Sequence, residues 1–416
     1  MWELFKARLT IVGDLVVELY GQRIGVLRGD WRTFDLVPDP AAATRFGLDS
    51  TVMSLSVPLQ VRSTRSRASI RRNFFAELLP EGRMRTRLAQ ISGVQEHDVI
   101  GLLRQFGRDV AGALQIWDPQ VPGEPKSPRY EPVDQGGVAR MLAAVSEEPL
   151  GNKPIGGKTS LAGVQDKIVL ARRNDGGWSR VVDGAPSTHI LKPFRARYPT
   201  LIYDEEYGAR LARAVGLTSY ATWVEEFEGI PAVVIERYDR DPLAPQARVH
   251  QEDGNQVLGA SGVQKYQREG GVVSLERMAR AFRGAGGIQM VEALYRQLVV
   301  AVAVGNLDMH AKNVSVLHPP DGTCRLAPAY DMVPQAHLPT DGELALAVNG
   351  VYRHESVTGS DLIAEGERWG IPHAAVLVEA VLAALSEAIN AEVPLPGAHP
   401  GLVEDIGGFI DRLRQG

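Results

Sequence analysis

The sequence predicts an α+β protein with more than one domain. Segments in which apolar and polar residues alternate, as they do in β-strands, are concentrated in the first 240 residues of the 416-residue chain. From residue 275 onward the apolar residues recur with helical spacing. Between them, residues 117–133 carry five prolines and few apolar residues, which is typical of a linker. A chain of this length has room for two or three domains.

The part before this linker mixes strands and helices. Apolar residues such as Phe74 and Leu78 share one side of a helix that Pro80 ends or kinks. The expected elements are a hairpin over 15–27 with its turn at Gly21-Gln22, a strand over 53–59, a helix over 73–82, further helices over 83–106, and a strand that ends at Ile116.

A loop suited to covering phosphates follows a short helix expected around 135–147. Residues 151–158 are rich in glycine and lysine and lead into 159–167. Strand-like residues follow at 168–171, and a second strand ends at His189–Pro193, with Lys192 near its end. Glycine lets backbone N–H groups approach phosphates, and the lysine adds a point charge. No Walker A motif is present. A plain hairpin turn and an exposed strand-end lysine are the alternative interpretations.

The remaining elements are predicted from capping residues and periodicity. Asp204 is the expected cap of a helix over 205–215, and either Glu205 or Glu206 is placed to pair with Lys192, although surface helices carry glutamates without such a role. The other expected elements are strands over 221–227 and 231–235 and helices over 275–284, 287–304, 360–369 and 372–391.

The most informative stretch is residues 305–331. Asp308 is followed five residues later by Asn313, and Asp331 comes further on, behind Tyr330. In phosphoryl-transfer sites with this spacing, the first Asp accepts the proton of the attacking hydroxyl, while the Asn and the later Asp hold magnesium. The apolar run 298–304 is expected to deliver Asp308 from a buried element. Turn or capping roles for Asp308 and Asn313 are the alternative.

Composition and charge exclude several classes of protein. A net charge of −5 argues against a generic nucleic-acid binder, and a lone cysteine, Cys324, excludes an internal disulfide. We expect Cys324 to be a packed strand residue. Met1–Lys6 do not resemble a signal peptide, and no apolar run reaches the roughly 20 residues of a membrane span. We therefore expect a cytoplasmic protein that is not inserted in a membrane. Arginines concentrate between Arg62 and Arg72, where they could contact a phosphate backbone or an acidic partner, or form local ion pairs.

Together these motifs resemble the HipA-type toxin serine/threonine kinases of bacterial toxin–antitoxin systems. The resemblance covers nearly the whole chain in order and is weakest over 338–372. The residues that carry it lie at 73–80, 107–113, 160–167, 189–192, 235–240, 250–253, 305–313 and 328–331.

The resemblance implies a fold and a site. The fold would be a two-lobed protein-kinase-like domain, with a small β-rich lobe and a large helical lobe, preceded by an α+β N-terminal subdomain. The expected division is 1–117 for this subdomain, 118–133 for the linker, 134–240 for the small lobe and 241–416 for the large lobe. Asp308, Lys192 and Asn313 would be catalytic, and Asn313 and Asp331 would hold Mg²⁺. The ATP-binding residues would be Ala162, Gly163, Val164, Gln165, Asp166, Lys167, Lys192, Glu236, Arg237, Tyr238, His310, Lys312, Asn313, Tyr330 and Asp331.

The resemblance also implies regulation and partners. Ser160 would be autophosphorylated, which would open the phosphate loop and stop the kinase; a backbone-bonding role is the alternative. Members often have glycine where this chain has Met309, so a narrowed catalytic loop and an altered substrate preference are expected. The substrate would be a translation-related protein such as an aminoacyl-tRNA synthetase. A HipB-type antitoxin would neutralise the toxin and link it to operator DNA.

Two other functions fit parts of the sequence. A pseudokinase could act as a co-repressor with a DNA-binding partner, but it would not need Lys192, Asp308, Asn313 and Asp331 together. A metal-dependent phosphohydrolase could use Asp308, His310 and Asp331, but it would need further ligands, and it leaves Lys192 and the Ser160 loop without a role.

Overall fold

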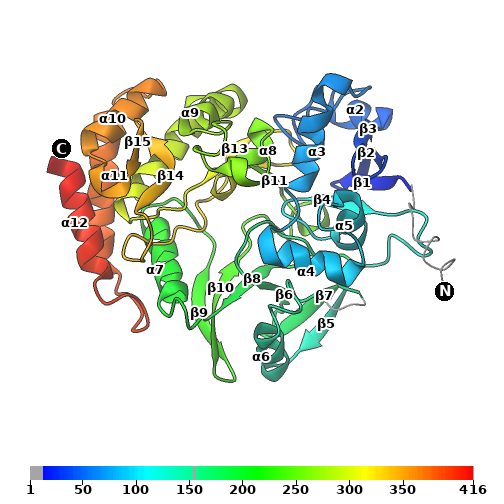
Figure 1. Ribbon diagram of the computed structural model, residues 1–416, viewed down its shortest axis with the longest axis horizontal. Helices are drawn as coiled ribbons and strands as arrows, with labels where there is room; N and C mark the ends of the chain where they lie inside the picture. Colours follow the sequence, from blue (N-terminus) through cyan, green and yellow to red (C-terminus); the bar gives the residue numbers. More distant parts are fainter. Residues whose placement is uncertain (1–12, 153–155, 416) are drawn as a thin grey trace.

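The chain folds into three parts that meet around one centre. The structure, a computed structural model, describes residues 13–152 and 156–415; Met1–Lys6, used above to judge a signal peptide, lie outside them. Figure 1 shows an N-terminal subdomain (blue), a small lobe built on a sheet (cyan to green) and a large helical lobe (yellow-green to red). The N-terminal subdomain contacts both lobes, through Arg83 to Asp166 and through Glu77 to Lys312.

A four-stranded antiparallel sheet, in the order β3-β2-β1-β4, forms one side of the N-terminal subdomain. Its elements are β1 (Leu15–Leu19), β2 (Gln22–Arg28), β3 (Asp35–Pro38), α2 (Pro40–Phe46), α3 (Ala68–Ala76), α4 (Gly82–Ser92), α5 (Val99–Phe106) and β4 (Leu114–Trp117). The predicted hairpin is confirmed, but its turn is one residue earlier than predicted. Leu19 pairs with Gln22, which leaves Tyr20-Gly21 as the loop, and both have positive φ, as a type I′ turn requires.

The strand predicted over 53–59 is not formed, so that prediction was wrong. The apolar side chains of this segment, such as Met53 and Val57, are buried as expected. The backbone, however, bends around the carboxylate of Glu252. The Ser54 hydroxyl donates to one oxygen at 2.6 Å, and the Leu55 N–H donates to the other at 2.7 Å. A buried carboxylate must be hydrogen-bonded, and this segment supplies the donors.

The small lobe is a six-stranded sheet in the order β5-β7-β6-β8-β10-β9. Its elements are β5 (Arg129–Val133), α6 (Gln135–Ala143), β6 (Ile168–Arg172), β7 (Trp178–Val182), β8 (His189–Pro193), α7 (Leu201–Ala214), β9 (Thr222–Phe227) and β10 (Ile230–Glu236). The last five residues of the predicted linker therefore form an edge strand. Pro132 is compatible with this position because an edge strand leaves some of its backbone N–H groups unpaired. The other domain boundaries remain predictions.

Helix α7 begins earlier than predicted. It starts at Leu201, so Asp204 lies within the first helical turn and is not its N-cap. The Asp204 side chain is fully buried, and its Oδ1 accepts a hydrogen bond of 2.8 Å from the backbone N–H of His399. The prediction of a capping role was wrong because this carboxylate is used to hold the C-terminal segment against the helix.

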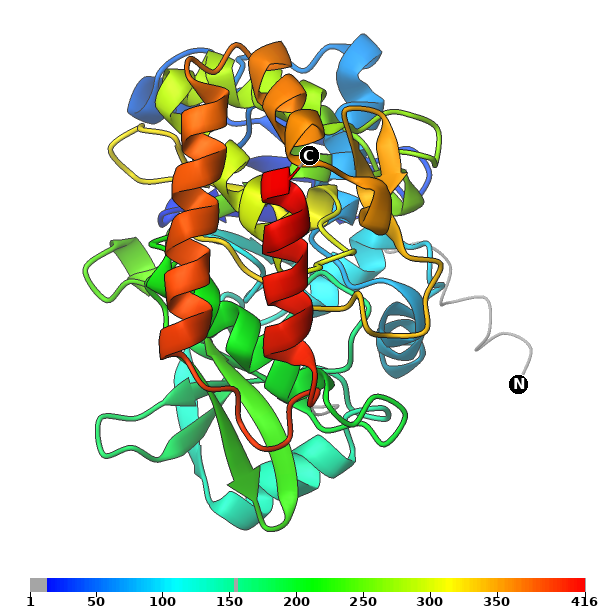
Figure 2. The same ribbon diagram turned by 90° about the vertical axis from the view of Figure 1, so that its left-hand side faces the viewer.

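The large lobe is mainly helical and holds the largest core. Its elements are β11 (His250–Asp253), α8 (Gly254–Leu258), α9 (Leu275–Ala303), β12 (Ser315–His318), β13 (Arg325–Leu326), β14 (Glu343–Val348), β15 (Val351–Arg353), α10 (Gly359–Arg368), α11 (Ala374–Ala391) and α12 (Leu402–Gln415). The two helices predicted over 275–304 form α9, which is interrupted at Gly286 and Gly287, where the backbone is non-helical. Helix α12 was not predicted; Figure 2 shows it lying alongside α11.

Helix α11 is the one helix among residues 13–152 and 156–415 that is long and apolar enough to span a membrane, and 33% of it is buried inside the protein. Its buried residues, including Val378, Leu382 and Leu385, belong to the core of the large lobe. The helix packs against α9, α10 and α12. The apolar residues on one face of α11 therefore form part of the core of this lobe.

Gly208 lets α7 approach the chain just after Asp331. An ideal Cβ at Gly208 would overlap the carbonyl oxygen of Met332 and lie 2.9 Å from Cδ of Pro334. We predict that Gly208→Ala lowers the free energy of unfolding by about 1–3 kcal/mol, because helix and loop must move apart. Urea denaturation measures this change. Gly408→Ala on α12 is the matched control, since its Cβ would meet nothing within 4 Å. Equal stability of the Gly208 variant and the wild type would contradict the prediction.

Candidate active site

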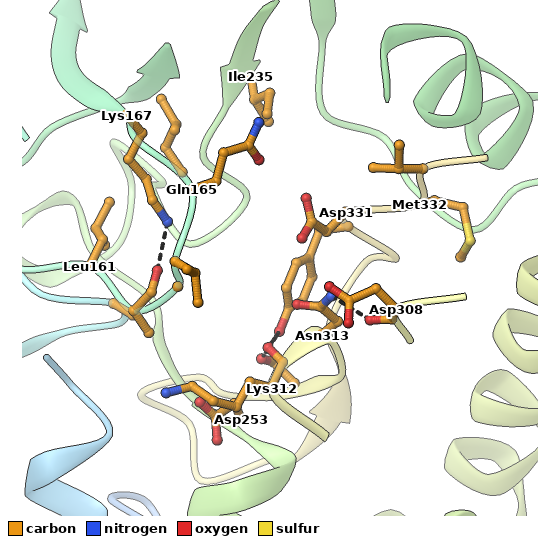
Figure 3. Close-up of a pocket in the computed structure, with 18 of the residues that line it drawn as sticks. Leu161, Gln165, Lys167, Ile235, Asp253, Asp308, Lys312, Asn313, Asp331 and Met332 are labelled. Carbon is orange, nitrogen blue, oxygen red and sulfur yellow. Dashed lines mark hydrogen bonds between the residues drawn. The ribbon is translucent and has the colours of Figure 1, made fainter. Parts of the chain in front are cut away.

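A cavity of about 420 Å³ lies where the three parts of the chain meet. Figure 3 shows Asp308, Asn313 and Asp331 on one side of it and Leu161, Gln165 and Lys167 on the opposite side. The lining therefore combines the predicted phosphate loop with the predicted catalytic segment. It includes 161–165, Lys167, Lys192, 235–239, Asp308, His310, Lys312, Asn313, Ser315 and 330–333, together with Glu77, Leu78 and Glu81 of the N-terminal subdomain.

Asp308 lies at the mouth of this cavity on a backbone that is held rigidly. The apolar run 298–304, which forms the end of α9 and its C-cap, is buried and leads to Asp308. The Asn306 side chain accepts a hydrogen bond from the Asp308 N–H at 3.0 Å, and the Asn313 amide donates to the Asp308 carbonyl at 2.8 Å. The Asp308 side chain is 43% exposed, and the Tyr266 hydroxyl lies 3.5 Å from its carboxylate. It is thus fixed at its base and open to an incoming group.

Burial and the neighbouring charge of Asp331 raise the pKa of Asp308 to about 6. A carboxylate with a raised pKa is a stronger base than one in water. Its position and basicity suit removal of a proton from a hydroxyl that attacks a phosphoryl group.

Lys192 joins two carboxylates from different parts of the site. Its Nζ lies 2.6 Å from Oε1 of Glu205 on α7 and 2.7 Å from Oδ1 of Asp331. Burial would lower the pKa of Lys192, but the two carboxylates outweigh it, so that the pKa is raised and the ammonium stays charged. Burial likewise opposes ionisation of Asp331, yet Lys192 lowers its pKa to about 2. The predicted lysine–glutamate pair is present, with Glu205 as the partner; Glu206 pairs with Arg210 instead.

Asn313 and Asp331 offer oxygen ligands of the kind that Mg²⁺ prefers. The amide nitrogen of Asn313 is used by the Asp308 carbonyl, which leaves its Oδ1 as the free atom. Lys192 binds only Oδ1 of Asp331, so Oδ2 remains available. Asp331 also adopts a positive φ of 54°, a strained conformation that is more common at functional sites. The donor set fits a magnesium ion, which would neutralise phosphate charge there.

Three tyrosines line the part of the cavity next to the end of β10. The ring of Tyr238 lies 5.4 Å from that of Tyr330 and 6.1 Å from that of Tyr220. The Tyr238 hydroxyl donates to Gln251, and the Tyr330 hydroxyl donates to the Lys312 carbonyl at 2.8 Å. These bonds hold the rings as flat apolar surfaces, which suit a purine base. Tyr220 and Gln251 were not predicted.

The two other predicted hinge residues, Glu236 and Arg237, have different side-chain partners. Glu236 and Arg237 are part of its lining. The Glu236 carboxylate accepts from the Ala221 N–H at 2.9 Å. The Arg237 guanidinium turns away into a buried cluster, where it donates to Asp239 at 2.8 Å and to Ser187 at 2.8 Å. Its side chain therefore has a structural role, and its backbone N–H donates to the Thr188 carbonyl at 2.9 Å.

The phosphate loop brings most of its predicted residues to the cavity. Ala162, Gly163, Val164 and Gln165 line it, and Gly163 has a positive φ of 112° that a side chain would strain. Lys167 donates from Nζ to the Ala162 carbonyl at 2.6 Å. Burial and the nearby Lys192 lower its pKa to about 8.

The position of Asp166 does not agree with its expected role in binding the cofactor. It is not among the lining residues of the cavity. Its Oδ2 lies 2.6 Å from Nη2 of Arg83, on the N-terminal subdomain, and 3.2 Å from Nη2 of Arg195. The side chain therefore fixes the outer end of the loop. From the sequence, its place between Gln165 and Lys167 gave no sign of this.

Comparisons with known proteins agree with this arrangement. A family model described as the HipA-like C-terminal domain matches residues 159–391, more than half of the chain, and one described as the HipA N-terminal domain matches residues 15–117. The chain belongs to the HipA-type toxin kinase family.

Relatives of known name are found in several bacteria. The Sinorhizobium fredii protein Y4mE, whose name describes it as a candidate kinase, is 36% identical over 296 residues, which cover 68% of this chain and 69% of the relative. The serine/threonine-protein kinase toxin HipA of Shewanella oneidensis is 27% identical over 340 residues, covering 77% of this chain and 75% of the toxin.

A solved structure matches nearly the whole chain. It is a chain of the Shewanella oneidensis HipA, HipB and operator DNA complex, with a TM-score of 0.75, 24% identity, and coverage of 96% of this chain and 95% of that one. This likeness concerns the fold. The predicted HipA-type fold, with its two lobes and its N-terminal α+β subdomain, is confirmed.

Ser160 of this HipA-family chain is inaccessible in the conformation described. Its side chain is fully buried, and its hydroxyl donates to the Leu78 carbonyl of the N-terminal subdomain at 2.8 Å. Its backbone N–H donates to the Asp109 carbonyl at 3.0 Å. The alternative role, bonding to backbone, is therefore realised here, and phosphorylation would require the loop to leave this position.

His310 and Lys312 line the cavity but have different surroundings. Burial lowers the pKa of His310 to about 3, so its imidazole is neutral. The Lys312 ammonium is buried and lies 2.6 Å from Glu77 and 2.9 Å from Glu81. Lys312 is thus tied to the N-terminal subdomain and is not free to meet a nucleotide.

Met309 does not narrow the catalytic loop. Its side chain is buried and belongs to the core of the large lobe, near Leu298 and Leu344. The expectation of a changed substrate preference rested on a side chain that faces the cavity, and Met309 is not part of the cavity lining. The predicted narrowing of the loop was wrong because Met309 faces the lobe interior, and the substrate preference stays a prediction. Cys324 likewise lies just before β13 and not within a strand, and burial raises the pKa of its thiol to about 12.

Several lining residues were missed by sequence reasoning. They lie far from the catalytic segment in the chain and carry no motif of their own. They are Glu77, Glu81, Tyr220, Asp253, Lys265, Tyr266 and Ser315. Asp253 belongs to the His250–Asp253 segment that supported the family resemblance, and burial raises its pKa to about 7. That segment was the one available signal; the others needed the tertiary structure.

Proposed function

We propose that the chain is a protein serine/threonine kinase that transfers the γ-phosphoryl group of ATP, with Mg²⁺, to a serine. The observation that carries this proposal is Lys192, held between Glu205 and Asp331 on the same cavity as Asp308. In kinases this ion pair and the metal-binding Asp must be in place together for transfer. A binding module without activity has no need of the combination.

Each residue has a part in the reaction. Asp308 takes the proton of the serine hydroxyl while the oxygen bonds to the γ-phosphorus, and the bond from that phosphorus to the bridging oxygen breaks, which leaves ADP. Lys192 binds phosphate oxygens of the nucleotide, and the loop from Ala162 to Lys167 covers them. Asn313 and Asp331 would hold Mg²⁺. Tyr238 and Tyr330 would enclose the adenine.

We further propose that the chain acts as a cytoplasmic growth-inhibiting toxin. Its family membership supports this, as does the name of the Shewanella oneidensis relative. The substrate would be a translation-related protein of the aminoacyl-tRNA synthetase class. The complex in which the structural neighbour was solved supports a HipB-type antitoxin as partner and operator DNA as a target of the assembled complex.

Arginines of the N-terminal subdomain are candidates for the DNA contact. Arg71 is buried in a pair with Asp35, and Arg67 donates to the Ser56 carbonyl at 2.6 Å, so these two have local roles. Arg62, Arg65 and Arg72 remain. We predict that reversing these three to Glu lowers operator affinity of the toxin–antitoxin complex at least tenfold and reduces its salt dependence. Fluorescence anisotropy with labelled operator measures this affinity. An unchanged affinity would show that these arginines do not contact the DNA.

Autophosphorylation of Ser160 is the proposed means of self-limitation. A phosphoserine carries about −1.5 to −2 charges and cannot return to the buried position beside Leu78. We expect kinase activity to decline as phosphate accumulates on Ser160 and to persist in Ser160→Ala. Hydrogen exchange over 156–167 should rise with phosphorylation. If ATP-treated protein never carries phosphate at Ser160, even in part, this regulation is wrong.

One labelling experiment separates the three functions considered. The chain is incubated with Mg²⁺ and [γ-³²P]ATP, and protein-bound label, free phosphate and nucleotide affinity are measured. Label on protein supports the kinase. Free phosphate without label would indicate a phosphohydrolase, for which residues 13–152 and 156–415 offer no cluster of three or more His, Cys, Asp or Glu suited to a metal. Tight ATP binding without either would indicate a co-repressor module.

A further inference from the structure

The transferred phosphoryl group needs positive charge close to Asp308, and few side chains of the cavity can provide it. Phosphoryl transfer depends on cations placed where negative charge is carried between the two oxygens. Among the described residues that line the cavity, the lysines and arginines are Lys167, Lys192, Arg237, Lys265 and Lys312. His310, two positions after Asp308, is neutral because burial lowers its pKa to about 3.

All five of these cations have partners among the described residues, and the partners show which part of the cavity each cation serves. Arg237 belongs to the buried cluster with Asp239, and Lys167 donates to the Ala162 carbonyl within the phosphate loop. Lys192 is held by Glu205 and Asp331 on the nucleotide side. Lys312 has two carboxylates, Glu77 and Glu81, within 2.6 and 2.9 Å.

Lys265 is the cation that the structure places beside the residues contacting Asp308. It ends η3 (Gly262–Lys265), the next residue is Tyr266, and the Tyr266 hydroxyl lies 3.5 Å from the Asp308 carboxylate. The ring of Tyr266 meets that of His310 edge-on, with centroids 5.4 Å apart. Burial and Asp331 raise the pKa of Asp308, and Lys265 is the cation that most opposes this rise. The Lys265 Nζ lies 5.3 Å from the centroid of the Tyr266 ring, so its charge lies close to the end of the cavity where Asp308 is placed.

The N-terminal subdomain holds Lys265 in this place. The Lys265 Nζ is buried and lies 2.9 Å from Oε2 of Glu81, while the other oxygen of Glu81 faces Lys312. Gly262, at the start of η3, donates its N–H to Glu77 at 2.7 Å. The backbone N–H of Glu81 donates to the Gly163 carbonyl of the phosphate loop at 3.1 Å. One short segment of this subdomain thus fastens the phosphate loop, the catalytic loop and Lys265 together.

We propose that Lys265 is a catalytic residue whose ammonium stabilises the phosphoryl group as it passes from ATP to the serine oxygen, and that Glu81 positions it. The inference rests on the proposed kinase function. The bonds formed and broken are those of that reaction: the proton goes to Asp308, ADP leaves, and Lys265 keeps its charge throughout. A desolvated cation is more effective than one in water, and Lys265 is almost entirely removed from solvent.

The test compares variants of the full chain with Mg²⁺ and [γ-³²P]ATP, with label on the chain itself as the product. Lys265→Met should lower kcat by about 10²-fold while KM for ATP changes less than threefold. Lys265→Arg, which keeps the charge, should recover at least a tenth of the wild-type rate. Glu81→Gln, which keeps the shape but loosens the positioning, should lower kcat about tenfold. Lys126→Met, at an exposed surface lysine, is the control and should match the wild type.

The results separate this inference from the function on which it rests. If the wild type labels and Lys265→Met labels at the same rate, Lys265 has no catalytic role and the kinase stands. If Lys265→Met loses ATP affinity or melting temperature in proportion to its rate, while Glu81→Gln is fully active, the lysine is only structural and the inference is overturned. If the wild type does not label at all, the proposed function and this inference fall together.

Discussion

Asp308→Asn is expected to lower the rate of phosphoryl transfer about 10³-fold while the chain still binds ATP. A general base contributes about 10²–10⁴-fold to such reactions, and asparagine cannot accept the proton. The backbone around Asp308 is held by Asn306 and Asn313, so the substitution leaves the loop in place. The nucleotide side of the cavity, where Lys192 pairs with Glu205, is also unaffected.

Single-turnover labelling measures the rate, and calorimetry measures ATP affinity. Asp175→Asn is a matched control, because Asp175 lies in the exposed turn between β6 and β7 and bonds only to its neighbours Arg173 and Gly177. The control should keep the wild-type rate. An Asp308→Asn variant within tenfold of the wild type would mean that another group takes the proton.

Asp109→Ala is expected to cause the largest loss of stability, about 3–5 kcal/mol in the free energy of unfolding. Asp109 is fully buried, and its carboxylate lies 2.9 Å from Arg240 and accepts a bond of 2.7 Å from Ser187. Arg237 and Arg248 lie at 3.9 and 3.7 Å. Without Asp109, Arg237 and Arg240 share Asp239, and Arg248 loses the carboxylate with which it is paired. Removal of one partner from a buried ionic cluster leaves charge uncompensated.

Urea denaturation of the full chain measures this effect. Asp14→Ala is the control, since the Asp14 pair with Arg28 lies at the surface, and exposed ion pairs contribute about 0–1 kcal/mol. A loss below 1 kcal/mol in the Asp109 variant would show that the cluster is not needed to join the parts. The variant should also loosen the phosphate loop, because it removes the carboxylate to which the Thr159 hydroxyl donates at 3.4 Å.

The arrangement of the candidate catalytic residues could be predicted from the sequence because these residues stand at fixed spacings. Asp308 and Asn313 are five residues apart on one loop, and Lys192 and Glu205 belong to a strand and the helix that follows it. Local patterns of this kind can be recognised without knowledge of the fold. The same holds for strands β6, β8, β9 and β10 of the small lobe, which are short segments rich in strand-forming residues.

The rest could not be predicted because it depends on contacts between distant parts of the chain. Glu77 reads as a polar position near the end of a helix, and nothing in the sequence connects it to Lys312, 235 residues away. The 53–59 segment has a strand-like pattern, but Ser54 and Leu55 donate hydrogen bonds to Glu252, and the backbone bends around this carboxylate and forms no strand. Asp204 has the composition of a helix cap and instead binds the C-terminal segment.

The most direct measurement is a map of phosphate on the chain by mass spectrometry after incubation with Mg-ATP, with Asp308→Asn treated in parallel. A kinase with a self-limiting loop acquires phosphate on Ser160 in the wild type and none in the variant. Absence of phosphate from both proteins, with ATP bound by both, would contradict the proposed activity and favour a nucleotide-binding co-repressor.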